Sequence, residues 1–186
     1  CWFWGAGTKP GLDSFEKKTG KRGMMVSAVD LLKGIAVGAG MGVCQVEGAN
    51  GGLHTNYEGK VEAALKALLE DGYDFAYIHV EAPDEMGHQG SVEKKVQAIE
   101  YLDGRVIKPL TEKLDREGID YRLLVLPDHP TPIRVRTHTA DSVPYMLYDS
   151  TAPLAKDWIY NEKTGRDSGK SVEQGYQLIE HLFHKQ

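Results

Sequence analysis

The chain has 186 residues, of which 41% are hydrophobic and 26% are charged, proportions that are ordinary for one globular domain with a sizeable core. The net charge of −5 argues against a surface that binds nucleic acid or an anionic membrane. No apolar run approaches the ~20 residues of a membrane span, and we expect no secretory signal. Because Cys1 and Cys44 are too few for a disulfide scaffold, we expect a reducing compartment, the cytoplasm.

The start of the chain predicts a missing segment. The first residue is Cys1 rather than Met, and the sequence continues at once into the apolar run Trp2-Phe3-Trp4. A natural amino terminus is rarely so apolar from its first residue. We therefore interpret the chain as a fragment that is entered at a strand.

Apolar runs bounded by Gly, Pro or polar residues predict six strands. They cover residues 1–4, 22–26, 43–46, 73–80, 121–126 and 145–148. Helical periodicity and capping residues predict helices between them. These helices cover residues 14–19, 27–38, 58–70, 91–117 and 171–184. The alternation predicts an α/β three-layer sandwich, in which one sheet contains all six strands and helices cover both faces.

Two of these helices carry specific expectations. Ser27 is expected to cap the helix that ends near Gly38 or Gly40. The helix over 91–117 has an apolar stripe at helical spacing. The stripe consists of Val92, Val96, Ile99, Leu102, Val106, Leu110 and Leu114. After residue 149 the chain is polar and irregular until the last helix.

Acidic and imidazole side chains follow two of the predicted strands. Asp84 and His88 are expected on the loop after the strand over 73–80, and Asp128 and His129 follow the strand over 121–126. His138 comes shortly afterwards. Open α/β sheets place their chemistry at the carboxyl ends of strands. The five residues therefore predict a metal site, and one that suits two metal ions.

Each of these residues also has a simpler interpretation as a surface cap or turn residue, but five such residues after strands favour the metal site. Adjacent side chains on a straight strand point to opposite faces, so Asp128 and His129 can act together only if the chain turns. Pro127 and Pro130 flank the pair and favour such a turn. A mixed oxygen and imidazole set suits Mn²⁺ or Zn²⁺ better than Mg²⁺.

Two other polar residues have weaker signals. His79 lies inside a predicted strand, so it is expected in the core or in support of a ligand rather than as a ligand itself. Lys33 could meet the anion of a substrate, although most lysines are simply solvated.

Three motifs together resemble the archaeal-type cofactor-independent phosphoglycerate mutases of the alkaline phosphatase superfamily. They are VEAPDEMGH at 80–88, LPDHPTP at 126–132, and THT at 137–139 followed by VPY at 143–145. The segments WFWGAGTKP at 2–10 and SAVDLLKG at 27–34 also look like that family. The resemblance covers nearly the whole chain.

The resemblance implies two divalent ions, Mn²⁺, Mg²⁺ or Zn²⁺, beside a nucleophilic serine. Asp84, His88 and His138 match the ligands of one ion, and Asp128 and His129 match part of the other ligand set. In such enzymes the serine takes the phosphoryl group of a phosphoglycerate and returns it to the neighbouring hydroxyl, an isomerisation of glycolysis. The substrate would be a small phosphorylated molecule.

The sequence departs from the family pattern at its amino-terminal side. The expected serine and its aspartate are not among the 186 residues, nor is the substrate-capping domain, so we interpret residues 1–186 as the carboxyl-terminal part of a phosphatase-like domain. We expect this part to bind at most one ion tightly, to lack mutase activity, and to self-associate through apolar surface near Cys1–Trp4. The alternatives are a homoserine-kinase-like, phosphopentomutase or phosphatase activity, or a metal-binding module without catalysis.

Overall fold

The computed structural model of the protein describes residues 7–8, 11–154 and 158–184. The strand and the apolar surface expected at 1–4 lie outside these ranges. The chain divides into two units, which we describe separately. Unit 1 comprises residues 1–86 and 92–110, and unit 2 comprises residues 87–91 and 111–186. Both contain helices and strands, which confirms the α/β class.

Unit 1 is built on a parallel sheet of three strands in the order β2-β1-β3. The central strand β1 (Gly23–Val26) pairs with β2 (Gly42–Cys44) on one side and with β3 (Phe75–Ile78) on the other. All four residues of β1 are buried. A strand covered on both faces is expected to be a continuous apolar run, and this explains why β1 was predictable from the sequence. The residues of β2 are half-buried, and β3 exposes Tyr77, so these two strands were predictable from their apolar residues and not from complete burial.

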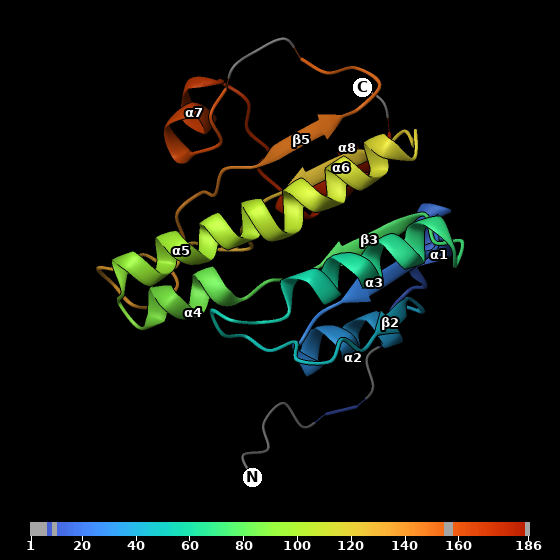
Figure 1. The fold of residues 1–186 in the computed structure, drawn as a ribbon, viewed down its shortest axis with the longest axis horizontal. Coiled ribbons are helices and arrows are strands. Elements are labelled where there is room, and N and C mark those ends of the chain that lie inside the picture. The colour runs from blue at the N-terminus through green and yellow to red at the C-terminus, as the bar shows by residue number, and fades with distance from the viewer. Residues whose placement is uncertain (1–6, 9–10, 155–157, 185–186) are drawn as a thin grey trace. The chain divides into compact units, whose positions relative to one another are not determined.

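Two helices cover opposite faces of this sheet (Figure 1). The helix α2 (Asp30–Gly38) connects β1 to β2, and α3 (Tyr57–Leu69) connects β2 to β3. The two connections run in opposite directions across the sheet, so right-handed crossovers place the helices on opposite sides. The core between α3 and the sheet consists of Met24, Val26, Ala64 and Ala67.

The helix ends of unit 1 follow capping chemistry, with one exception. Ser14 accepts a hydrogen bond from the N–H of Lys17 at the start of α1 (Phe15–Thr19), and Asn56 accepts one from the N–H of Gly59 in α3. The expectation that Ser27 caps α2 is wrong. The residue before α2 is Val29, and the Ser27 hydroxyl accepts the N–H of Val29 ahead of the helix.

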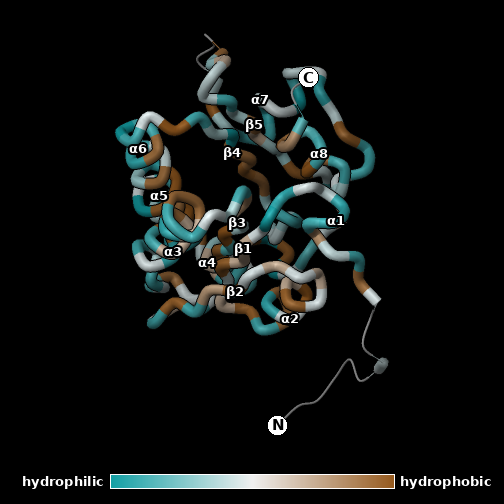
Figure 2. The backbone as a smooth tube through the Cα atoms, turned by 90° about the vertical axis from the view of Figure 1, so that its right-hand side faces the viewer, coloured by the Kyte–Doolittle hydropathy of each residue, from teal (hydrophilic) through white to brown (hydrophobic). Residues whose placement is uncertain are grey.

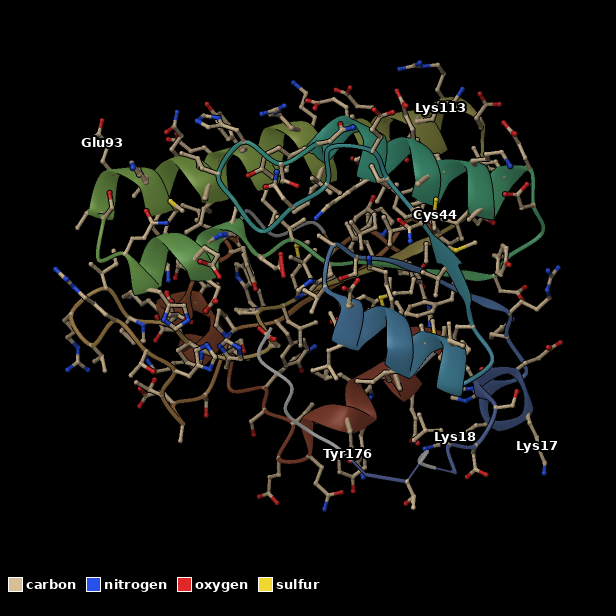
Figure 3. The ribbon with its side chains drawn as sticks, turned by 90° about the horizontal axis from the view of Figure 1, so that it is seen from below. Lys17, Lys18, Cys44, Glu93, Lys113 and Tyr176 are labelled. Carbon is tan, nitrogen blue, oxygen red and sulfur yellow. The ribbon has the colours of Figure 1, made fainter. Side chains whose placement is uncertain are left out.

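The long helix predicted over 91–117 is interrupted by a π-helical turn. It consists of α5 (Val92–Leu102), the π-helix η1 (Asp103–Ile107) and α6 (Lys108–Arg116). Figure 2 shows hydrophobic and hydrophilic stretches alternating along the coil of α5, and Figure 3 shows Glu93 and Lys113 pointing away from their helices.

No helix within the described ranges is long and apolar enough to cross a membrane.

The apolar stripe of this long helix does not stay on one buried face. Its first three members are exposed and its last three are buried, so the stripe that the sequence shows is buried over only part of its length. The exposed members are Val92, Val96 and Ile99, and the buried ones are Val106, Leu110 and Leu114. A π-helical turn contains more residues than an α-helical turn, so it changes the phase of the stripe between these two groups.

An arginine of η1 joins this helix to α3 inside unit 1. Arg105 donates from Nε to Glu58 Oε1 at 2.6 Å and from Nη2 to Glu58 Oε2 at 2.7 Å. Its guanidinium lies 4.7 Å from the ring centroid of Tyr57 and 5.0 Å from that of Tyr101. A bidentate ion pair between aromatic rings is a geometry that arginine provides and lysine does not.

Unit 2 contains an antiparallel pair of strands, β4 (Arg122–Val125) and β5 (Met146–Asp149). The expectation that residues 73–80 and 121–126 share one sheet is therefore wrong for the described residues, because β3 and β4 belong to different sheets. An apolar run predicts that a segment is a strand, but it does not predict which other strand it pairs with. The backbone N–H and C=O groups that make the pairing are the same at every residue. Contacts between residues far apart in the sequence favour the pairing of β4 with β5, such as that of the Tyr121 ring just before β4 and the Tyr148 ring on β5, whose centroids are 5.8 Å apart.

The end of the chain is less helical than predicted. The helix expected over 171–184 is a 3₁₀ turn, η2 (Gly175–Gln177), followed by α8 (Leu178–Phe183). The polar stretch after β5 contains a short helix, α7 (Glu162–Asp167), with Asn161 as its N-cap. The Asn161 side chain accepts the N–H of Thr164, a capping bond that offsets the weak helical pattern of this segment.

An ion pair across the β4–β5 ladder predicts a component of acid sensitivity. Asp149 accepts hydrogen bonds from the Thr151 hydroxyl and N–H and from Arg122 Nε, which together lower the pKa of Asp149 to about 2 from its ordinary value of 3.8. A carboxyl with a lowered folded-state pKa stabilises the fold above its unfolded pKa, and this stability is lost as the pH falls from about 4 to about 2. We expect the unfolding midpoint of Asp149→Asn to fall less steeply over this range than that of the wild type. Parallel pH profiles in chemical denaturation would contradict this assignment.

Candidate metal centre

Asp84 and His88 lie on a short helix, α4 (Ala82–His88), rather than on the expected loop. Pro83 is compatible with the first turn of a helix, where its missing N–H has no intrahelical partner. Ala82 and Met86 are buried on one face. Asp84 and His88 are four residues apart and therefore share a face. The boundary between the two units falls within α4, so the helix itself sets the spacing of this pair.

His138 meets His88 inside unit 2. The two Nε2 atoms are 3.2 Å apart, and the ring centroids are 5.0 Å apart. The Nδ1 atom of His88 lies 3.0 Å from the backbone carbonyl oxygen of Arg136. This carbonyl can only accept a hydrogen bond, so the proton of neutral His88 is assigned to Nδ1. The lone pair of Nε2 then points toward His138.

The three residues fit the requirements of a divalent ion. One ligand atom each from Asp84, His88 and His138 lies within 4.8 Å of the others. Two nitrogens at zinc-like bond lengths are about 2.9 Å apart at a right angle and about 3.3 Å apart at the tetrahedral angle. The 3.2 Å between the two Nε2 atoms falls in this interval. Three protein ligands with further open positions are typical of catalytic rather than structural metal sites.

The loop that carries His138 is held by backbone hydrogen bonds. The N–H groups of Val135 and Arg136 both donate to the carbonyl of Pro132, and the N–H of Thr139 donates to the carbonyl of Pro130. The last bond closes the loop across the segment that contains Arg136 and His138. The position of His138 therefore depends on backbone pairing that does not involve its own side chain.

Within unit 2, Asp128 and His129 lie together beside His138. The Asp128 Oδ2 atom is 3.4 Å from His129 Nε2, and the Asp128 side chain also accepts the N–H of His129. The chain therefore turns at this pair, as its flanking prolines predicted. The His129 ring lies 3.6 Å, centroid to centroid, from the His138 ring. Asp128 and His129 are not members of the group formed by Asp84, His88 and His138, and their role as ligands of a second ion stays a prediction.

A buried lysine and a glutamate lie near the start of α4 in unit 1. Lys60 is 0% exposed, and its ammonium donates to the carbonyl of His79 at 2.8 Å. Burial lowers the pKa of Lys60, against the opposing effect of Glu81. Burial also raises the pKa of Glu81; Lys60 opposes this rise, and the charges of Glu85 and Asp84 add to it. Lys60 therefore offsets part of the negative charge that gathers around Asp84.

The remaining sequence candidates have other partners. Lys33 pairs with Asp30 one helical turn away, with 2.8 Å between Nζ and Oδ1, and its contact with a substrate stays a prediction. His79 follows the last residue of β3, and its Nδ1 lies 3.3 Å from the hydroxyl of buried Ser27. His79 therefore lies just after the strand rather than inside it, and its supporting role stays a prediction.

Sequence reasoning missed two residues of this region. Lys60 shares the helical spacing of buried Tyr57, Val61 and Ala64, which is a signal that could have identified it. Arg136 has a φ of 56°, and no other non-glycine residue in the described part of the chain has a positive φ. Nothing in an arginine side chain predicts such a backbone, so the sequence carries no signal for it.

Comparisons with known proteins support the family that the motifs suggested. The chain is 48% identical over 98% of its length to a probable 2,3-bisphosphoglycerate-independent phosphoglycerate mutase of Geobacter sulfurreducens. It is 51% identical over 96% of its length to the 2,3-bisphosphoglycerate-independent phosphoglycerate mutase of Methanosarcina mazei. It spans about 45% of the length of each of these relatives.

Solved structures and a family model agree with this likeness. The PH0037 protein of Pyrococcus horikoshii superposes with a TM-score of 0.82 at 28% identity, over 97% of this chain and 55% of that one. The cofactor-independent phosphoglycerate mutase of Thermoplasma acidophilum superposes with a TM-score of 0.61 at 20% identity, over 93% of this chain and 39% of that one, which shows a shared fold. The model of the Metalloenzyme superfamily matches residues 2–170, and the chain therefore belongs to that superfamily.

Proposed function

We propose that the chain supplies the metal-binding half of a phosphoglycerate mutase that interconverts 3-phosphoglycerate and 2-phosphoglycerate through a phosphoserine. The observation that carries this proposal is the convergence of Asp84, His88 and His138. The names of the relatives support the substrate, a small phosphorylated acid of glycolysis, and with it a cytoplasmic location.

In this proposal the chain supplies one part of the active site. The other part would come from the segment of the relatives that this chain does not match. Residues 1–186 would form the carboxyl-terminal part of the phosphatase-like domain. The nucleophilic serine, the other ligands of the second ion and the substrate-capping domain would belong to the remaining half. A divalent ion, Mn²⁺, Mg²⁺ or Zn²⁺, would stabilise the charge on the transferred phosphoryl group and lower the pKa of the serine hydroxyl.

The chain's own residues would hold this chemistry in place. Asp84 and His88 present an oxygen and a nitrogen from one helical face, and His138 adds a nitrogen from a loop that is closed by backbone hydrogen bonds. Asp128 and His129 would be ready to contribute to the second ion once its other ligands are present. We propose that the chain alone binds one ion tightly, because two protein ligands rarely hold an ion against water.

The test is a coupled assay with 3-phosphoglycerate on the protein at the full length of its relatives. We expect turnover that is lost on dialysis against a chelator and restored by Mn²⁺. The same preparation is tested with a general phosphomonoester, a pentose phosphate, and homoserine with ATP. Turnover of one of these in place of 3-phosphoglycerate would replace the mutase proposal with another reaction of the same site, and absence of all turnover would favour a metal-binding module without catalysis.

A further inference from the structure

The strained backbone of Arg136 lies directly against a proposed metal ligand. A positive φ in a non-glycine residue is uncommon and costly, and such residues gather at functional sites. Arg136 combines its φ of 56° with a carbonyl oxygen 3.0 Å from His88 Nδ1. The unfavourable φ and the carbonyl that meets the imidazole thus belong to the same residue.

The side chain of Arg136 reaches the same place. A Cβ added to Gly90, two residues after His88, would lie 2.7 Å from Arg136 Cζ. The guanidinium therefore lies over the end of α4, where Gly90 with a φ of 71° leaves room for it. Both the carbonyl and the side chain of Arg136 connect its loop to the carboxyl end of α4.

We infer that Arg136 is a positioning residue, whose left-handed backbone directs its carbonyl onto His88 Nδ1 and so makes Nε2 the ligating atom. A histidine that binds a metal ion needs its other nitrogen held by an acceptor, which fixes both the tautomer and the orientation of the ring. This inference rests on the proposed function for its metal, but the tautomer that it assigns to His88 exists without one.

The test varies how well residue 136 tolerates a positive φ. Arg136→Gly and Arg136→Asn accept the left-handed conformation and keep the carbonyl in place. Arg136→Val is β-branched and resists it, so the carbonyl should move. We expect Mn²⁺ affinity within threefold of the wild type for the first two variants and at least about tenfold weaker for Arg136→Val. Arg134→Val is the matched control, because Arg134 is exposed in the same loop and has no positive φ.

A spectroscopic readout separates positioning from stability. In the metal-free chain we expect ¹⁵N chemical shifts of His88 that report a protonated Nδ1 in the wild type and in Arg136→Gly, and a shifted tautomer balance in Arg136→Val. Equal loss of affinity in Gly, Asn and Val variants would overturn the inference and assign the effect to the guanidinium. Unchanged affinity and an unchanged tautomer in Arg136→Val would also overturn it. Failure of the wild type to bind any divalent ion would instead count against the proposed function.

Discussion

Replacing Tyr57 by alanine is expected to lower the free energy of unfolding of unit 1 by about 4 kcal/mol, the typical loss for truncating a large buried aromatic side chain. Tyr57 is fully buried at the first turn of α3. Its hydroxyl donates to the carbonyl of Leu53 at 2.9 Å, and its ring meets that of Tyr101 edge to face at 5.8 Å between centroids. Alanine would remove these contacts and the aromatic face on which Arg105 lies.

The matched control is Tyr57→Phe, which keeps the ring and removes only the hydroxyl. We expect it to cost about 1 kcal/mol, the net value of one buried hydrogen bond. Urea unfolding, with hydrogen exchange of the α3 amides to locate the change, measures both variants. Equal losses in the two variants would mean that the hydroxyl rather than the ring and its arginine dominates.

Replacing His88 by alanine is expected to weaken divalent-metal binding by at least about tenfold. The change removes one nitrogen of the group and leaves the acceptor carbonyl of Arg136 without its imidazole. It also leaves Asp84 as the lone ligand on its face of α4. Calorimetric titration with Mn²⁺ measures the loss.

His184→Ala is the control for His88→Ala. It also removes one imidazole, but from an exposed residue just after α8 that does not belong to the group. Its binding isotherm should superpose on that of the wild type. An unchanged isotherm for His88→Ala, or an equal loss for His184→Ala, would contradict the assignment of His88.

The central strand β1 was predictable because burial on both faces leaves a continuous apolar run, Met24-Met25-Val26, and the half-buried strands were predictable from shorter apolar runs between turn residues. Their pairing was not, because the partner of β4 depends on contacts between distant residues. The helix α4 was missed since Pro83 and Gly87 resemble loop residues, whereas proline in a first turn and a buried Ala82 permit a helix. The π-helical turn likewise has no signature in its residue types.

The candidate site, too, was only partly predictable from the sequence. The residue types of Asp84, His88 and His138 and their places after strands were visible in the sequence, and the structure brings their ligand atoms together. The prolines on either side of Asp128 and His129 predicted a turn there, and the structure brings the two side chains together. What the sequence did not reveal is the backbone that holds the ligands: the carbonyl of Arg136 depends on a torsion angle that arginine does not favour.

The stoichiometry of Mn²⁺ binding to this chain, measured by calorimetry, tests whether Asp84, His88 and His138 form one metal site. We expect one tight equivalent per chain for the wild type, and its loss in Asp84→Asn and in His138→Ala. Asn keeps the shape of the aspartate and removes its charge, so a loss there reports on the ligand rather than on the fold. No tight binding, two tight equivalents, or one equivalent that survives both substitutions would contradict it.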